Sequence, residues 1–212
     1  MNSAKPVIII GAGGHAKVLL NALKLSSVQV LGLTDSDTAK HGSTILGTPV
    51  LGDDIIIDTY DHNDVRLIIG LGSTQPGSIR REVYELFQAK GYEFSMCLHP
   101  SATVAPDVTL PPGSQVMAGA IIQPGCKIGV NSIINTRASI DHDCRIGDHV
   151  HIAPGAILGG TVIIEHGSHI GTHATVIENI TIGPDAMIAA GACVIANLNS
   201  QERVAGIPAK PF

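Results

Sequence analysis

An aliphatic residue recurs at every sixth position through the second half of the chain. The positions run from Val104 to Val194, and all sixteen are Val, Ile or Leu. The residue two places before each of them is small or aliphatic and never charged, as with Ala138 before Ile140. This period is typical of the hexapeptide repeat, in which short strands separated by corners form coils of about 18 residues.

The repeat predicts a left-handed parallel β-helix. Because side chains alternate along a strand, the aliphatic residue and the small residue two before it both point into the coil. Successive coils are expected to stack about 4.8 Å apart, as neighbouring strands do. The residue three before each aliphatic one is often Gly, Asn or Asp, such as Gly125 and Asn131, and these are the types that corners accept.

The residue just before each aliphatic one is expected to point outward, so that the outward residues form three faces. One face carries Thr103, Ile121, Ser139, Ile157, Thr175 and Cys193, and a second carries Gln115, Ile133, His151, His169 and Met187. Both are apolar enough to need a partner. The third face is more polar and carries Thr109, Lys127, Arg145, Ile163 and Thr181. Two apolar faces and one polar face predict a homotrimer closed around a three-fold axis.

The composition suits this architecture and argues against several functions. Hydrophobic residues make up 44% of the 212 residues and aromatic ones 3%, so the core must be built from aliphatic side chains. A formal net charge of -5 with 13 Lys and Arg argues against nucleic-acid binding. The sequence contains neither a long apolar run nor the pattern of a signal peptide, which predicts a cytoplasmic protein without a membrane span.

The first half of the chain alternates strand-like and helix-like segments. Strands are expected at Val7–Ile10, Val28–Leu33 and Arg66–Gly70, and helices after the glycine-rich GAGGHAK and around Ile79–Ala89. This order predicts a small parallel sheet with helices on its faces, a Rossmann-like α/β domain. We assign residues 1–98 to this domain, and residues 99–212 to the all-β β-helix domain with its C-terminal tail.

A glycine motif lies where the first helix is expected to begin. Gly11, Gly13 and Ala16 fit G-x-G-x-x-A, whose small residues let a phosphate approach the backbone N–H groups at a helix N-terminus. Asp35, after the second strand, is placed to accept hydrogen bonds from a ribose or sugar hydroxyl. The domain is too short for six strands, so we favour a mononucleotide or nucleotide sugar as ligand. A tight turn without a ligand is the alternative.

Three segments resemble the PglD/NeuD-like sugar acetyltransferases, a family of hexapeptide-repeat acyltransferases. They are GAGGHAK near the N-terminus, NTRASIDHDCRIGDHVHIAPGAILGG in the repeat and VAGIPAK near the C-terminus. The resemblance implies that the N-terminal domain binds a nucleotide sugar and that the β-helices of neighbouring subunits bind acetyl-CoA between them. It implies N-acetylation of a UDP- or dTDP-linked 4-amino-4-deoxy sugar for a bacterial surface glycan such as lipopolysaccharide. Sugar or sialic acid O-acetylation is the alternative.

The resemblance also assigns roles to individual residues. His142, in the segment IDHDC, corresponds to the general base of the family, and Asp143 to the carboxylate that raises its basicity. Contacts to acetyl-CoA fall on His151, Thr172 and Ala190. Gly13, Gly14 and His15 are implied to line the phosphates of the sugar nucleotide, and Asp35, Ser36 and Gly72 to lie near the rest of that ligand. Members often have an acidic residue where this chain has Ser36, so recognition of the sugar or ribose is expected to differ here.

The expected chemistry is direct acyl transfer without an acyl-enzyme. Histidine acts as a base near pH 7, and general base catalysis contributes about 10²–10⁴ in rate. Gly160 lies 18 residues after His142 and should stack on it, with its N–H placed to bind the developing oxyanion. Cys144 occupies an inward position and is interpreted as core rather than as a nucleophile. The alternative for His142 is an ordinary solvent-facing histidine at a corner.

Other functions remain open on the sequence alone. His166, His169 and His173 suggest a zinc site, but their places on the coil do not converge, so no metal is expected. The four cysteines lie far apart without a C-x-x-C motif. The glycine motif also suits an NAD-dependent oxidoreductase, although the second half offers no hydride acceptor site. A non-catalytic β-helix scaffold is disfavoured by the IDHDC segment.

Overall fold

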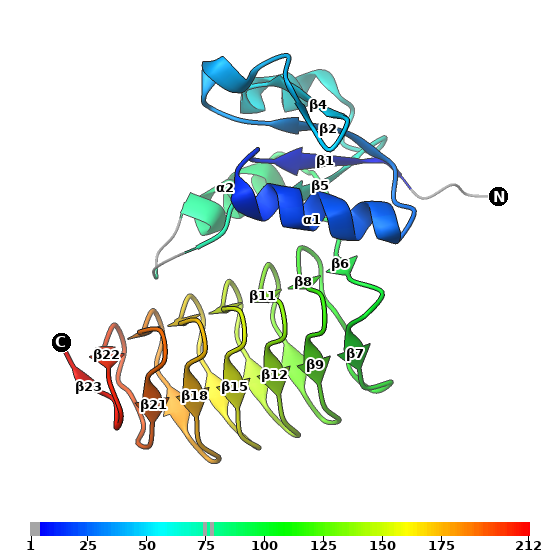
Figure 1. Cartoon of the computed structure of the whole chain (residues 1–212). Helices are drawn as coiled ribbons and strands as arrows, with labels where there is room; N and C mark the ends of the chain where they lie inside the picture. The colour runs from blue at the N-terminus through cyan, green and yellow to red at the C-terminus, as the bar shows by residue number, and fades with distance from the viewer. Residues whose placement is uncertain (1–4, 74–75, 77–78) are drawn as a thin grey trace.

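The computed structural model describes residues 5–73, 76 and 79–212 and has two parts (Figure 1). A small α/β domain holds the N-terminus, and a prism of short stacked strands extends to the C-terminus. The domain lies along one side of the prism, with helix α1 (Gly14–Leu25) between its sheet and the coils (Figure 1). The predicted fold, a Rossmann-like domain followed by a left-handed parallel β-helix, is confirmed. In the described part of the chain, no helix has the length and apolar character needed to cross a membrane.

The N-terminal domain is a five-stranded sheet covered on both faces. Its order is β3-β4-β2-β1-β5, parallel except for the β3–β4 hairpin. Helix α1 packs on one face through Leu19 and Leu23, and helix α2 (Ile79–Ala89) packs on the other through Phe87. The strands are β1 (Val7–Ile10), β2 (Val30–Thr34), β3 (Thr44–Ile45), β4 (Thr48–Gly52) and β5 (Arg66–Ile69), with 3-10 helices η1 (Thr38–Lys40) and η2 (Asp54–Thr59). Burial on both faces explains the unbroken aliphatic run of β1.

Strand β1 lies at the centre, paired with β2 on one side and with β5 on the other. The chain leaves β1 at Gly11, β2 at Asp35 and β5 at Gly70, so three loops meet at one edge of the sheet. Gly11 has φ 97°, which permits the sharp turn from β1 toward α1. Open parallel sheets bind ligands at the carboxyl ends of their strands, at the point where the connections from two neighbouring strands lead to opposite sides of the sheet.

The β-helix has three parallel faces, which we name after one strand in each. The β8 face contains β6 (Cys97–Leu98), β8 (Gln115–Val116), β11 (Ile133–Ile134), β14 (His151–Ile152), β17 (His169–Ile170), β20 (Met187–Ile188) and β22 (Arg203–Ala205), with β23 (Lys210–Pro211) antiparallel at its end. The β9 face contains β7 (Thr103–Val104), β9 (Ile121–Ile122), β12 (Ser139–Ile140), β15 (Ile157–Leu158), β18 (Thr175–Val176) and β21 (Cys193–Val194). The β10 face contains β10 (Lys127–Ile128), β13 (Arg145–Ile146), β16 (Ile163–Ile164) and β19 (Thr181–Ile182).

The six-residue period fixes both the core and the corners. Partner strands are offset by 18 residues, as in Ile134↔Ile152↔Ile170, and these inward residues are buried. From residue 113 to residue 191, every position three before an inward aliphatic residue has a positive φ. Glycine occupies six of these corners, but Arg137, His149, Thr161 and His173 also adopt the left-handed conformation. The stacking therefore imposes the corner conformation even on residue types that do not favour it.

The coils depart from the ideal repeat at both ends. Strand β6 pairs with β8, so the β-helix begins at Cys97, before the boundary assigned at residues 98 and 99. Leu110 is followed by Pro111 and Pro112, and no strand forms there. The final coil is two residues shorter, since Met187 pairs with Arg203.

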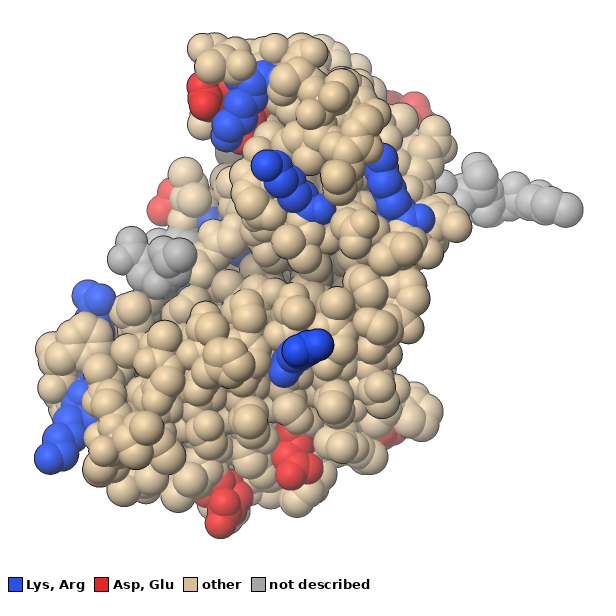
Figure 2. All heavy atoms as spheres, viewed as in Figure 1, with Lys and Arg blue, Asp and Glu red and all other residues tan. Residues whose placement is uncertain are grey.

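The N-terminal domain covers the β8 face at strands β8, β11 and β14. Gln115 and Ile133 are fully buried on its outer side, and His151 retains 7% exposure. This face was one of two expected to need a neighbouring subunit, but these strands of it are covered within the chain. The β9 face stays open, with Ile121 37% and Ile157 49% exposed, and it carries few charged residues where it faces the viewer (Figure 2).

Candidate active site

The first turn of α1 offers backbone N–H groups that no side chain caps. Gly13 is the N-cap residue and the turn contains no acidic side chain. A Cβ at Gly13 or Gly14 would meet no atom within 4 Å, so the surface beside this turn is open. The N-terminus of a helix attracts anions because its N–H groups and its dipole both present positive charge. The predicted phosphate contacts therefore lie on a surface suited to an anion.

Both carboxylate oxygens of Asp35 accept hydrogen bonds within the protein, whereas the sequence suggested that they bind a ribose or sugar hydroxyl. Its Oδ2 accepts hydrogen bonds from the Ala12 N–H and the Lys40 Nζ, both at 2.9 Å, and its Oδ1 accepts one from the Asp37 N–H at 2.9 Å. Partial burial opposes ionisation, but these hydrogen bonds outweigh it and lower the pKa of Asp35. The carboxylate thus holds the glycine loop against the end of β2, and Ser36 beside it is exposed.

His15 points toward the β-helix. Its Nε2 lies 2.7 Å from Oε1 of Gln115 on β8. Burial lowers the pKa of His15 to about 4, helped by the nearby Arg80 cation and opposed by the Gln115 hydrogen bond. The imidazole is therefore uncharged near neutral pH and cannot supply a cation to a phosphate. Gly72, on the loop after β5, lies alongside it, since a Cβ there would be 3.5 Å from the His15 Cβ.

The three residues expected to contact acetyl-CoA line one cavity. It has a volume of about 360 Å³ and includes His151, Thr172 and Ala190. It lies at the β8–β9 corner, formed by turns 117–119, 135–137, 153–155, 171–173 and 189–191. Gly171 and Ser73 also line it, so the cavity touches the loop that follows β5 in the N-terminal domain.

Both ring nitrogens of His151 already have partners. Nδ1 lies 2.7 Å from the Ser73 carbonyl oxygen, and Nε2 lies 3.0 Å from Nδ2 of Asn135. Burial and the neighbouring His169 lower the pKa of His151 to about 3. His151 thus joins the two domains and presents its ring, rather than a free nitrogen, to the cavity.

Sequence reasoning placed His169 on the same face as His151 but did not assign it to the site. Its ring packs edge-on against His151 with centroids 5.0 Å apart, and it lines the same cavity. Its Nδ1 is buried without a hydrogen-bond partner among the described residues. The 18-residue offset from His151 was the signal that could have identified it.

His142 and Asp143 form a pair at a different corner. The β9–β10 corner consists of turns 123–125, 141–143, 159–161 and 177–179. His142 Nδ1 lies 2.9 Å from Asp143 Oδ2, and the His142 side chain is 58% exposed. The Asp143 hydrogen bond is the main reason that the pKa of His142 is raised. An exposed imidazole with one nitrogen held by a carboxylate presents its other nitrogen to solvent or to a substrate.

Gly160 stacks on His142 as expected from its position one coil later. A Cβ at Gly160 would lie 2.6 Å from His142 Nε2, so only glycine leaves room for the imidazole in this position. The Thr161 N–H donates to the His142 carbonyl oxygen at 2.9 Å and fixes the stacking of the two turns.

Within one chain, the structure does not bring the His142 corner and the Thr172 cavity together. Strands of the β9 face, such as β12 and β15, separate the two corners. The cavity does approach the sugar-nucleotide residues, because Ser73 lines it and Gly72 lies beside His15. The predicted site residues thus form two groups at opposite edges of the β9 face.

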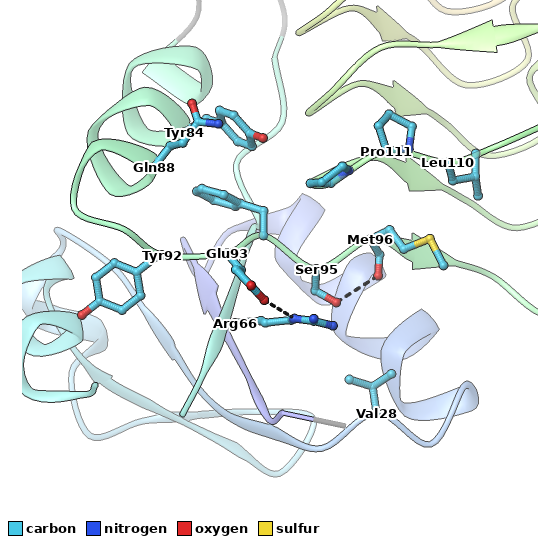
Figure 3. A pocket seen from close by; sticks show the side chains of 12 residues that line it. Val28, Arg66, Tyr84, Gln88, Tyr92, Glu93, Ser95, Met96, Leu110 and Pro111 are labelled. Atoms are coloured by element: carbon cyan, nitrogen blue, oxygen red, sulfur yellow. Dashed lines mark hydrogen bonds and ion pairs between the residues drawn. The ribbon is translucent and has the colours of Figure 1, made fainter. Parts of the chain in front are cut away.

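Two other features lie outside these groups. A larger cavity of about 710 Å³ lies between the N-terminal domain and the first coil, where Tyr84, Phe94 and Pro111 line it beside the Arg66–Glu93 ion pair (Figure 3). It contains none of the predicted site residues. Among the described residues, no three His, Cys, Asp or Glu side chains come together as a metal site requires. Cys144 is fully buried in the core.

Comparisons with known proteins show which proteins this chain resembles. Residues 6–87 match the PglD N-terminal domain family. The acetyltransferase domain of PglB from Neisseria gonorrhoeae FA1090 superposes with a TM-score of 0.91 at 33% identity, covering 99% of this chain and 100% of that one. PerB from Caulobacter crescentus, solved with CoA and GDP-perosamine, superposes with a TM-score of 0.90 at 35% identity, covering 99% of this chain and 98% of that one.

Among curated proteins, GDP-perosamine N-acetyltransferase of Escherichia coli O157:H7 is 36% identical over 91 residues, or 40% of this chain and 38% of that protein. Serine acetyltransferase 4 of Arabidopsis thaliana is 32% identical over 125 residues, or 55% of this chain and 29% of that protein. The chain spans about a third of the length of the curated relatives it matches. The full-length structural matches at above 30% identity, together with the N-terminal family match, show that this chain belongs to the PglD/NeuD-like family of acetyl-CoA-dependent sugar acyltransferases.

Proposed function

We propose that the protein transfers the acetyl group of acetyl-CoA to the amino group of a nucleotide-linked 4-amino-4-deoxy sugar. The observation that carries this proposal is the full-length similarity to PerB, whose structure contains CoA and GDP-perosamine. The uncapped first turn of α1 suits the phosphates, and the Thr172 cavity suits the cofactor. Because acetyl-CoA and nucleotide sugars are cytoplasmic metabolites, we place the reaction in the cytoplasm, as part of bacterial surface glycan synthesis.

His142 is the proposed general base. With its Nδ1–H donated to Asp143, the Nε2 lone pair faces Gly160 and the approaching substrate. The neutral sugar amine attacks the thioester carbonyl carbon, and a C–N bond forms while Nε2 takes the amine proton. Collapse of the tetrahedral intermediate breaks the C–S bond, and the imidazolium returns its proton to the CoA thiolate. The Gly160 N–H, which donates to no described residue, is the proposed donor to the oxyanion.

The separation of the two corners supports an active site shared between subunits. His142 and the Thr172 cavity flank the β9 face, whose outward residues Ile121 and Ile157 are exposed. If three chains meet through their β9 faces, the cavity of one chain approaches the partner subunit's His142. Light scattering is expected to return three chains of 21.9 kDa each, and a monomer that is fully active would exclude the shared site.

A thiol-release assay with acetyl-CoA tests the transfer. GDP-, UDP- and dTDP-linked 4-amino sugars serve as acceptors, and the matching 4-hydroxy sugars serve as controls. We expect CoA release only with an amino sugar, and a product that resists hydroxylamine, as an amide does. A hydroxylamine-labile product from the 4-hydroxy sugars would instead establish O-acetylation.

Asp143→Asn is expected to move the acid limb of the pH–rate profile to lower pH. Asp143 raises the pKa of His142, so the imidazole is neutral, and active as a base, only toward higher pH. Removing the charge lowers this pKa, and the weaker base should reduce the plateau kcat on the order of tenfold. An acid limb that stays in place or moves to higher pH would show that Asp143 does not act on the titrating group.

Gly160→Ala is expected to impair turnover without affecting the fold. The added methyl group would lie 2.6 Å from His142 Nε2 and must displace the imidazole. Displacing a catalytic group by about 1 Å costs on the order of 10²-fold in rate. The measurement is kcat together with the melting temperature. An unchanged kcat would mean that the imidazole does not act from this position.

A further inference from the structure

Gln115 connects two loops of the N-terminal domain, the glycine loop after β1 and the loop after β5. It lies on the outer side of β8, is fully buried beneath the domain and contacts it with both ends of its amide. Its Oε1 lies 2.7 Å from His15 Nε2, in the first turn of α1. Its Nε2 donates to the Ile69 carbonyl oxygen, at the end of β5, at 2.7 Å. Gln115 therefore fixes the glycine loop and the loop after β5 relative to the β-helix.

These two contacts determine where the proton of His15 lies. A carbonyl oxygen only accepts hydrogen bonds, so the amide atom facing Ile69 must be the NH₂ group. The atom facing His15 is then the amide oxygen, which also only accepts, so His15 Nε2 must carry a hydrogen. Arg80 on α2 and His151 on β14 are the other titratable groups near this ring. Burial and the Arg80 cation both disfavour a second proton.

We infer that Gln115 is a positioning residue that holds His15 in the neutral, Nε2-protonated form, so that His15 Nδ1 accepts a hydrogen bond from an N–H or O–H group of the nucleotide sugar. The identity of the ligand rests on the proposed function. A phosphate offers only acceptor oxygens, and an unprotonated Nδ1 would repel it. The expectation that His15 contacts the phosphates is therefore replaced by contact with a donor group of the sugar or ribose.

The surroundings of the ring support this assignment. The hydrogen-bonding directions of Nδ1 and Nε2 diverge widely in an imidazole, so the contact of Nε2 with Gln115 leaves Nδ1 directed away from Gln115. No described residue forms a hydrogen bond with Nδ1. Gly72 lies beside the ring, and as a glycine it leaves the space next to His15 open. His15 is also two residues after Gly13, within the same turn that is proposed to bind the phosphates.

The proton can be located in the intact protein by ¹⁵N NMR of the imidazole rings, with His15 assigned by comparison with a His15→Asn variant. At pH 7 we expect one protonated and one unprotonated nitrogen, with the proton on Nε2. GDP-perosamine should shift the Nδ1 resonance of the wild-type protein. A proton on Nδ1, or a doubly protonated ring, would overturn the tautomer. An Nδ1 resonance unmoved by saturating GDP-perosamine would overturn the ligand contact.

Two variants separate positioning from general stability. Gln115→Met removes both hydrogen bonds at similar volume, and we expect the KM for the nucleotide sugar to rise about 5- to 10-fold, with the KM for acetyl-CoA and kcat within about twofold. Gln115→Glu presents a carboxylate to His15, which favours the doubly protonated ring and should raise the same KM by more than about tenfold. Gln88→Met, at an exposed position of α2, is the matched control and should behave as wild type.

Equal increases in both KM values, or an unchanged nucleotide-sugar KM in Gln115→Met, would overturn the positioning role. The outcome is distinguishable from failure of the proposed function. If the wild-type protein released no CoA with any amino sugar, the proposal of acetyl transfer would be wrong. The NMR titration with GDP-perosamine would still decide whether His15 contacts the ligand.

Discussion

His142→Ala is expected to lower kcat by about 10²–10⁴-fold, the range that a positioned general base contributes. The imidazole is the only group of the β9–β10 corner that combines an exposed nitrogen with a carboxylate partner among the described residues. Its side chain is 58% exposed, so its loss should leave the melting temperature and the affinity for acetyl-CoA close to those of the wild type.

The matched control is His166→Ala. His166 occupies the same place in its hexapeptide as His142, two residues after an inward isoleucine, but at the corner between the β10 and β8 faces. It is exposed and lies at the third corner of the prism, which carries none of the predicted site residues. We expect wild-type kinetics from this variant. Near wild-type turnover in His142→Ala, or equal losses in the two variants, would remove His142 as the base.

Ile152→Asp is expected to unfold the β-helix. Ile152 is fully buried on β14, between Ile134 and Ile170 of the adjoining coils. The change removes an apolar side chain worth about 1.5–3 kcal/mol and places a carboxylate in a core that offers it no partner. Together, the lost apolar burial and the cost of burying an unpaired carboxylate exceed about 4 kcal/mol. This is a large part of the roughly 5–15 kcal/mol free energy of unfolding of a typical domain.

Thermal melts followed by circular dichroism test this prediction. Ile195→Asp is the control, because this isoleucine follows the last hexapeptide and is 53% exposed. Its melting temperature should stay within a few degrees of the wild type, since surface substitutions usually change stability by about 0.5 kcal/mol or less. A cooperative melt of Ile152→Asp at the wild-type temperature would contradict the inward orientation of the repeat.

The β-helix could be predicted from the sequence because its rule is local. The spacing of six residues specifies which side chain points inward, and an offset of 18 residues specifies its neighbours in the next coil, as with Ile134 and Ile152. The same rule predicted that Gly160 stacks on His142. The docking of the N-terminal domain follows no such rule. It depends on contacts between distant residues, such as the buried Arg80 of α2, whose guanidinium donates to the carbonyl oxygens of Asn131 at 3.4 Å and Gly113 at 3.5 Å in the β-helix.

For the same reason, the positions of the predicted site residues in the fold were easier to predict than their hydrogen bonds. The glycine motif predicted a helix N-terminus that a phosphate can approach, and the resemblance assigned His151, Thr172 and Ala190 to one ligand; these three residues line one cavity. The sequence could not show that His15 and His151 each use a ring nitrogen in a hydrogen bond between the two domains. Nor could it show that Asp35 binds the glycine loop. Each of these hydrogen bonds joins residues that the chain brings together only after folding.

A crystal structure of the protein with CoA and a nucleotide-linked 4-amino sugar tests the central claim most directly. We expect the CoA to lie along the cavity that contains Thr172 and Ala190, with its sulfur next to the partner subunit's His142. The sugar amine should lie within about 2.6–3.2 Å of the Nε2 of that histidine. A complex in which CoA binds away from this cavity, or in which the amine approaches no histidine of a β9–β10 corner, would contradict the account.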